Sequence, residues 1–365
     1  MSSPETNQTA SHSPGRRAWP WVFGVLVGIA ACVAVEIRFL GAAPSRSAAA
    51  AASKAALPSA ANPAGAVMLT EFTQPETRRW RTAPHGTQVC DGVTFICNGA
   101  IRTAGLNAAR EGNHYPGAVL DVPMNRRGSR IHLLQAAENT LDMTDGTPYG
   151  RLILRYANGE SRRIDLLFGI HGDDWLQDKG KPSEPPADPN STVAWLQRRG
   201  GDGSIIRFYH TAMENPLPAV AISSIDFISP LSQANLLLFG LTVDDDPRPL
   251  ATSYGPGESV EDDPAIPITF TLQDGAGQPA VGATLAWIAR GPRLRVDFPP
   301  FRADRRGQII IEVPRRAIRE IDYRANGPDG SSTSGNLKPN AAGAFPPTAI
   351  VKLSASGLTS QTSRP

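Results

Sequence analysis

Short apolar runs of strand length, separated by turn-forming residues, restrict the fold of this chain more than any other feature. Between Met68 and Val243 each run ends at glycine, proline, asparagine or aspartate. The 34 glycines and 33 prolines among 365 residues make up about 18% of the chain, against roughly 12% in average proteins. This excess argues against a helical bundle, and the strand-length runs predict an all-β protein.

The first strand-rich region spans residues 67–248 and predicts an antiparallel sandwich. Its clearest strand pair is Arg151–Tyr156 and Arg162–Phe168, joined by Ala157-Asn158-Gly159-Glu160. An Asn-Gly step between two β-prone runs is a strong hairpin signal. About eight strands without helical periods between them are typical of a sandwich. The other expected strands are Val89–Ile96, Ala118–Val122, Arg130–Ala136, Ile205–Tyr209, Ala219–Ile228 and Leu236–Val243.

A second strand-rich region follows a polar, acidic linker over residues 249–264. Residues 265–353 hold six or seven short runs, which predict a smaller immunoglobulin-like or transthyretin-like sandwich. Residues 354–365 lack a core pattern and are expected to form a disordered tail. The expected strands are Ile266–Leu272, Thr284–Ile288, Leu294–Phe298, Gln308–Val313, Ile321–Ala325 and Ala349–Leu353.

An uncharged segment near the N-terminus predicts a single transmembrane helix. Ala18–Val35 has eighteen residues without a charge, and apolar residues extend the segment to Leu40, which is about the length needed to cross a hydrocarbon layer. We therefore expect a short cytoplasmic tail over residues 1–17 and a transmembrane anchor over residues 18–40. Residues 41–66, of which thirteen are alanine, are expected to form an Ala/Pro/Ser-rich linker.

Three processing routes fit this N-terminal segment. It can remain as an uncleaved signal anchor, be cleaved as a signal peptide, or act as a lipoprotein signal in which Ile29-Ala30-Ala31-Cys32 leads to acylation of Cys32. All three routes place the remaining chain outside the cytoplasm, at the cell membrane, in the periplasm or at the cell surface. The formal net charge of +2 provides no surplus for a polyanion, so no nucleic-acid partner is expected.

The first sandwich region carries motifs that resemble a known module. Cys90-Asp91-Gly92-Val93-Thr94-Phe95, Gly169-Ile170-His171-Gly172-Asp173-Asp174-Trp175 and Ile222-Ser223-Ser224-Ile225-Asp226-Phe227 resemble a galactose-binding-like jelly roll in membrane proteins of planctomycete-type bacterial envelopes. The resemblance covers roughly half of the chain. It implies a sandwich fold and an accessory role in the cell envelope, including anti-sigma-associated signalling, more firmly than it implies a ligand.

The second region resembles the carboxypeptidase regulatory-like family. The segments that carry the resemblance are Gly277-Gln278-Pro279-Ala280-Val281-Gly282-Ala283-Thr284-Leu285 and Ala303-Asp304-Arg305-Arg306-Gly307-Gln308-Ile309-Ile310-Ile311-Glu312-Val313-Pro314. In that family the module is a noncatalytic appendage of many surface proteins. The resemblance therefore implies a packing or interaction module.

Sequence signatures of catalysis are missing from the chain. It contains no Gly-x-Ser-x-Gly, His-Glu-x-x-His, phosphate-loop or Cys-x-x-Cys motif, which are the local marks of the corresponding enzymes and metal sites. We therefore expect a noncatalytic protein without a metal or cofactor. The alternative is a hydrolase centred on His171, Asp173 and Asp174, the most polar local group.

A long insertion in the first region is the best candidate for a binding site. Residues 169–203 contain few β-prone runs, and long loops on a sandwich commonly bind ligands. Aromatic faces beside carboxylates and arginines suit a sugar, whereas the alternative is that the tryptophans close the end of the sandwich. The predicted ligand-binding residues are Asp173, Asp174, Trp175, Trp195 and Arg198.

Export also makes a disulfide between Cys90 and Cys97 feasible, because Cys32 lies in the apolar segment. If Val89–Cys97 were one straight strand, the two α-carbons would be about 23 Å apart at ~3.3 Å per residue, beyond the ~7 Å limit. The disulfide prediction therefore requires the chain to reverse at Asp91-Gly92.

These patterns favour a membrane-anchored, extracytoplasmic, noncatalytic protein of the cell envelope with weak carbohydrate binding. Two alternatives stay open, a scaffold or signalling-associated domain that binds another envelope protein and the hydrolase described above. Calcium binding by Asp244–Asp246 and Glu261–Asp263 also stays open, since carboxylates are the ligands of that ion.

The N-terminal segment makes a direct prediction about fractionation. The chain is expected to sediment with membranes, and deletion of residues 1–40 is expected to release it, because no other segment has eighteen uncharged residues. Protease added to spheroplasts should degrade the sandwiches. Protection from that protease would instead place them in the cytoplasm.

Overall fold

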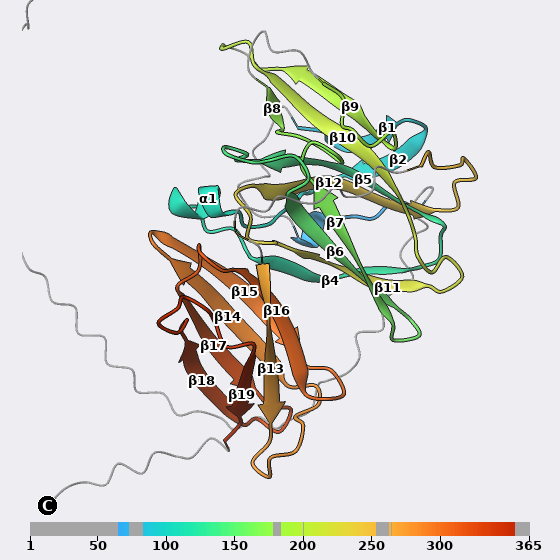
Figure 1. Cartoon of the computed structure of the whole chain (residues 1–365). Helices are drawn as coiled ribbons and strands as arrows, with labels where there is room; N and C mark the ends of the chain where they lie inside the picture. Colours follow the sequence, from blue (N-terminus) through green and yellow to red (C-terminus); the bar gives the residue numbers. More distant parts are fainter. Residues whose placement is uncertain are drawn as a thin grey trace, which may run out of the picture. The chain divides into compact units, whose positions relative to one another are not determined.

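The computed structural model describes residues 65–72, 83–177, 184–199, 201–252, 263 and 265–354. These residues form nineteen strands, the 3-10 helix η2 (Thr70–Phe72) and the short helix α1 (Leu106–Arg110), so the all-β prediction is confirmed (Figure 1). Within this part of the chain no helix is both long and apolar enough to cross a membrane. The expected anchor over residues 18–40, the linker up to residue 64 and the tail from residue 355 lie outside the described residues.

The first sandwich consists of two antiparallel sheets. The larger sheet has the order β3-β12-β5-β10-β8, with β9 on the other edge of β10, and the smaller sheet has the order β4-β11-β6-β7. The larger sheet contains β3 (Ile101–Arg102), β12 (Asn235–Asp244), β5 (Arg130–Glu138), β10 (Ile205–Glu214), β8 (Leu176–Gln177) and β9 (Ser191–Arg198). The smaller sheet contains β4 (Ala118–Arg126), β11 (Ile222–Ile228), β6 (Pro148–Tyr156) and β7 (Ser161–Leu167).

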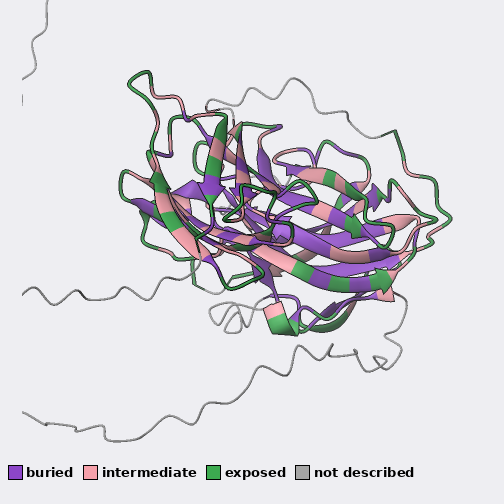
Figure 2. Ribbon diagram, turned by 90° about the horizontal axis from the view of Figure 1, so that it is seen from below, coloured by how far each residue is buried: buried purple, intermediate pink, exposed green. Residues whose placement is uncertain are grey.

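Both faces of the larger sheet are covered. Side chains such as Leu133 and Leu241 pack toward the smaller sheet, whereas Leu134 and Leu237 pack under the hairpin formed by β1 (Gly86–Cys90) and β2 (Val93–Cys97). Strands β5 and β12 are therefore buried along almost their whole length, and Figure 2 shows long buried stretches of strand in the interior of the protein. This double burial explains why their sequences are nearly continuous apolar runs instead of alternating ones.

The predicted turns of this sandwich are confirmed. The Tyr156 amide donates to the Glu160 carbonyl at 2.9 Å, and Gly159 has a φ of 85°, a backbone conformation that glycine adopts without a steric penalty. Asp91 and Gly92, with φ of 50° and 80°, reverse the chain between β1 and β2. The prediction of one strand-poor insertion over residues 169–203 is wrong, because β8 and β9 lie in it and pair with β10.

The second sandwich has seven strands in two sheets, with the orders β16-β13-β19 and β15-β14-β17-β18. Strands β13 and β19 are parallel. Sequence analysis missed β18, because Ser332–Leu337 contains only one large apolar residue and is not fully buried at any position. The strands are β13 (Ala265–Gln273), β14 (Thr284–Gly291), β15 (Leu294–Arg302), β16 (Gln308–Pro314), β17 (Glu320–Asn326), β18 (Ser332–Leu337) and β19 (Thr348–Lys352).

The two sandwiches belong to one compact unit, Pro58–Pro365, and contact each other closely at Gly117. The Gly117 amide donates to the Asp297 carbonyl at 2.8 Å, and a Cβ atom on Gly117 would lie 2.5 Å from the Phe298 ring. Phe298 stacks on Trp287 with ring centroids 3.7 Å apart. Nearby, Glu312 forms ion pairs with Arg151 at 2.9 Å and with Arg163 at 2.8 Å.

Phe298→Ala is expected to lower the free energy of unfolding by about 3–5 kcal/mol, because it removes a buried ring and leaves a cavity. Phe298 is 5% exposed, whereas Phe301 beside it is half-buried. Phe301→Ala is therefore the matched control and should lower the free energy of unfolding by less. Urea unfolding of the purified chain measures both. Equal losses in the two variants would contradict the packing described at this junction.

Candidate ligand cleft

A cleft of about 630 Å³ lies at the end of the larger sheet, where β5 stops and β10 continues alongside β8. Two segments form most of its wall, the loop that follows β5 and the segment that leads into β8. The cleft is lined by Glu138, Asn139, Thr140, Leu141, Asp173, Asp174, Trp175, Leu176, Gln177, Glu184 and Arg207.

Arg207 fixes the wall of this cleft. Its Nη2 atom contacts Asp173 Oδ2 at 2.7 Å, and its Nε atom donates to the Asp174 carbonyl at 2.8 Å. The Arg207 amide also donates to the Trp175 carbonyl at 2.8 Å. Because the guanidinium is buried and charge-assisted hydrogen bonds are the stronger ones, these contacts hold the three consecutive residues in one conformation.

The carboxyl group of Asp174 also lines the cleft. It accepts hydrogen bonds from Thr140 Oγ1 at 2.5 Å and from the Leu176 amide at 2.7 Å. Burial raises the pKa of Asp174 above its ordinary value in spite of these bonds. The cleft therefore offers a carboxyl group of raised pKa next to an indole.

Trp175 lines the cleft, whereas Trp195 does not. Trp195 is the cross-strand partner of Phe208 on β10, and the Trp175 carbonyl accepts the amide of Arg207, the preceding residue of β10. Both indoles also pack against the hydrophobic cluster under the β1–β2 hairpin. Lining of the cleft therefore distinguishes the two tryptophans.

The five predicted ligand-binding residues thus divide into two groups. Asp173, Asp174 and the half-buried Trp175 are brought together in the cleft. Trp195 is half-buried against the core under the hairpin, and its Nε1 atom has no hydrogen-bond partner among the described residues. Arg198 is exposed opposite Ile205 on the edge strand β9 and does not line the cleft.

His171 does not join the carboxylates of the cleft. Its Nδ1 atom accepts a hydrogen bond from the Leu167 amide at 2.9 Å, and its Nε2 atom lies 3.5 Å from Asp188. Its carbonyl binds Gln135 at 2.9 Å. Both ring nitrogens are therefore occupied, and the geometry does not gather the His171, Asp173 and Asp174 group of the hydrolase hypothesis.

Sequence reasoning missed the other eight residues that line the cleft, among them Glu138, Leu141 and Arg207. Glu138 forms a buried ion pair with Arg102, and Leu141 is 75% exposed. Arg207 follows the apolar pair that opens β10, and only its charge inside an otherwise apolar strand, I-I-R-F-Y-H, signals a buried partner.

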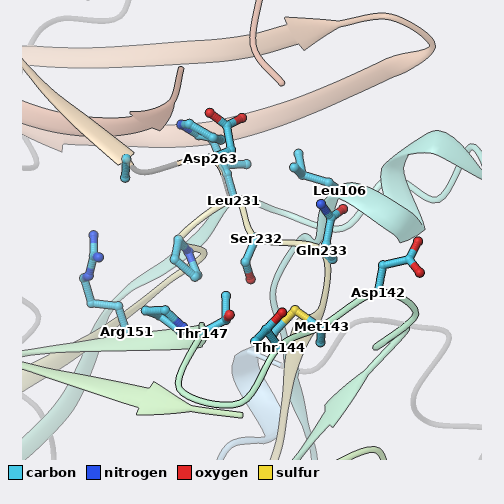
Figure 3. A pocket seen from close by; sticks show the side chains of 14 residues that line it. Leu106, Asp142, Met143, Thr144, Thr147, Arg151, Leu231, Ser232, Gln233 and Asp263 are labelled. Carbon is cyan, nitrogen blue, oxygen red and sulfur yellow. The ribbon is translucent and has the colours of Figure 1, made fainter. Parts of the chain in front are cut away.

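A second cavity lies between the two sandwiches, with Arg151, Ser232 and Asp263 on its walls (Figure 3). Its volume of about 70 Å³ is roughly one-ninth that of the cleft. A space of this size holds a few water molecules. The cleft at Trp175 is therefore the better candidate for a ligand.

Within the described part of the chain, no group of three or more histidine, cysteine or acidic side chains has the geometry to hold a metal ion. The carboxylates considered for calcium have protein partners. Asp245 accepts the Ser129 amide at 3.0 Å, and hydrogen bonds from Arg248 lower the pKa of Asp246 to about 2. Glu261 and Asp262 lie outside the described residues.

The predicted disulfide is absent, and both Cys90 and Cys97 are free, buried thiols. The expected reversal at Asp91-Gly92 does occur, but the register pairs Cys90 with Val93 and Cys97 with Gly86. The cysteines are thus offset by four residues along the hairpin, about 13 Å at ~3.3 Å per residue. That separation exceeds the roughly 7 Å limit for a disulfide.

No family model and no curated protein matches this chain. One solved structure that aligns with it is the crystal structure of the group B streptococcus pilus 2b backbone protein. The alignment covers 74% of this chain and 94% of the other, at 9% identity and a TM-score of 0.19. A similarity at this level supports no inference about function.

Because both thiols are free, chain denatured without reductant is expected to react with maleimide at Cys90 and at Cys97. Peptide mass spectrometry measures the label at each position, and a reduced sample is the control. A peptide pair linked through the two cysteines that disappears on reduction would contradict the register of β1 and β2.

Proposed function

We propose that this chain is a membrane-anchored, extracytoplasmic, noncatalytic protein of the bacterial cell envelope that binds carbohydrate in the cleft at Trp175. The observation that supports the proposal is a half-buried indole beside the Asp173–Arg207 ion pair in a cleft of about 630 Å³. The galactose-binding-like and carboxypeptidase regulatory-like resemblances suit this role, because both modules are accessory parts of surface proteins. The uncharged segment over residues 18–40 is the proposed anchor.

The chemistry of the cleft suits a sugar ring. The C–H face of a pyranose packs on an aromatic face, and its hydroxyl groups donate to carboxylates and accept from amides and guanidinium groups. Asp173, Asn139 and Gln177 supply such groups around Trp175. Since the cleft contains a single tryptophan, we expect weak affinity, about 0.1–1 mM, which corresponds to roughly 4–5.5 kcal/mol.

The test compares the tryptophan that lines the cleft with one that does not. A glycan array identifies a sugar that binds the full chain, and Trp175→Ala is expected to abolish that binding. Trp195→Ala is the matched control, because Trp195 packs against the same cluster under the hairpin but does not line the cleft, and it should retain binding. Loss of binding in both variants, or in Trp195→Ala alone, would exclude the cleft as the sugar site.

A protein partner is the second candidate function, and two exposed leucines favour it. Leu141 is 75% exposed at the cleft, and Leu196 is 59% exposed opposite Arg207. Exposed apolar side chains are enriched at protein-binding surfaces, and of these two only Leu141 lines the cleft. If the cleft binds a protein and the glycan array shows no binding, Leu141→Asp should weaken co-purification of an envelope protein with the chain. Ile310→Asp on the second sandwich is the control and should not weaken it.

A further inference from the structure

Two histidines that do not line the cleft lie buried under the β1–β2 hairpin. His132 on β5 and His210 on β10 are 1% and 5% exposed, and their ring centroids are 5.2 Å apart. They belong to the face of the larger sheet that the hairpin covers, and Phe95 of the hairpin packs edge-on against His210 at 5.7 Å.

A linear chain of hydrogen bonds runs through the two imidazoles and ends at a carboxylate on each side. His210 Nδ1 lies 2.9 Å from Asp91 Oδ2, in the turn of the hairpin. His132 Nδ1 lies 3.0 Å from His210 Nε2, and His132 Nε2 lies 3.1 Å from Asp244 Oδ1. The chain therefore joins the hairpin to β10, β5 and β12.

Counting protons shows what this chain requires. Each of its three contacts needs one hydrogen, and an ionised carboxylate accepts but cannot donate. Two neutral imidazoles carry only two N–H groups between them, so one contact would join two acceptors. A third proton on the histidine pair completes all three hydrogen bonds, and a fourth would place two N–H groups face to face between the rings.

Charged groups border this chain at both ends. Burial lowers the pKa of His132 below its ordinary value, although Asp244 and Asp246 oppose this effect. Burial alone would raise the pKa of Asp91, but hydrogen bonds from Thr192 and His210 and the charge of Arg248 lower it. One N–H toward Asp244, one toward Asp91 and one between the rings satisfy all three contacts.

We propose that Asp91, His210, His132 and Asp244 form a one-proton latch that fastens the β1–β2 hairpin to the larger sheet. The latch is complete only when the two imidazoles carry one proton more than their two neutral forms do. As the pH rises and this proton leaves, one hydrogen bond is lost. As the pH falls below about 6.5, the unfolded chain takes up a proton that folded His132 binds less well, so the folded hairpin loses stability in that direction as well.

Mass spectrometry of hydrogen exchange at the imidazole C2 position titrates each histidine of the full chain in detergent. The summed protonation of His132 and His210 is expected to stay near one between about pH 6.5 and pH 8, and the exposed His85 and His114 in the same sample are the internal references. A sum that falls to zero in parallel with His114 would overturn the latch.

Asp91→Asn tests the link to the hairpin without changing its shape, because asparagine tolerates the φ of 50° at this position. Burial raises the pKa of the Cys97 thiol to about 12, so alkylation of Cys97 at pH 7 reports opening of the hairpin. The variant is expected to lose the shared proton at pH 7, because the asparagine amide can donate to a neutral His210 and no contact then needs a third hydrogen. Its Cys97 should therefore be alkylated at about the wild-type rate. His114→Gln is the control and should keep the shared proton, and an Asp91→Asn variant that also keeps it would refute the proposal.

Discussion

The larger sheet of the first sandwich is buried on both faces, and this constraint determines much of the surrounding structure. Strand β5 has no exposed residue, although it contains a histidine, a glutamine and a glutamate. A buried polar group without a partner costs about 1–3 kcal/mol, so each of these side chains must be paired. Gln135 binds Tyr149 at 2.5 Å and Thr211 at 3.1 Å, Glu138 binds Arg102, and His132 binds His210 and Asp244.

The same sheet produces the cleft. Strand β5 ends at Glu138, and β8 takes its place beside the first residues of β10, so the loops at this junction surround an open space instead of a packed core. Arg207 lies at the junction and is buried, and its pairing with Asp173 satisfies its charge while it shapes the wall. A stability requirement and the candidate ligand-binding surface therefore share one ion pair, and the Trp175→Ala variant leaves both partners of that pair in place.

Local patterns in the sequence predicted most of the fold, because strand-length apolar runs and turn residues act over a few positions. The Asn158-Gly159 and Asp91-Gly92 turns form where they were predicted. Register is less accessible to sequence reasoning, and the disulfide failed because pairing begins at Cys90 and Val93. Strand β18 was missed because its sequence S-T-S-G-N-L lacks the apolar alternation that marks a half-buried strand.

The candidate site was predicted only in part for the same reason. Asp173, Asp174 and Trp175 are consecutive, so any structure keeps them together, whereas the position of Trp195 depends on which residue of β10 lies beside it. Similarly, His132 and His210 are 78 residues apart, and no local signal joins them. In this chain, long-range strand pairing decides both the composition of the cleft and the burial of the histidines.

Hydrogen–deuterium exchange of the backbone amides tests directly whether both faces of the larger sheet are covered. The structure predicts that β5 and β12 exchange among the slowest strands and that Val93–Cys97, which pairs with β1 and packs on the sheet, is also protected at neutral pH. Exchange of Val93–Cys97 at the rate of an unfolded chain, while β5 and β12 stay protected, would show that the hairpin does not cover the sheet.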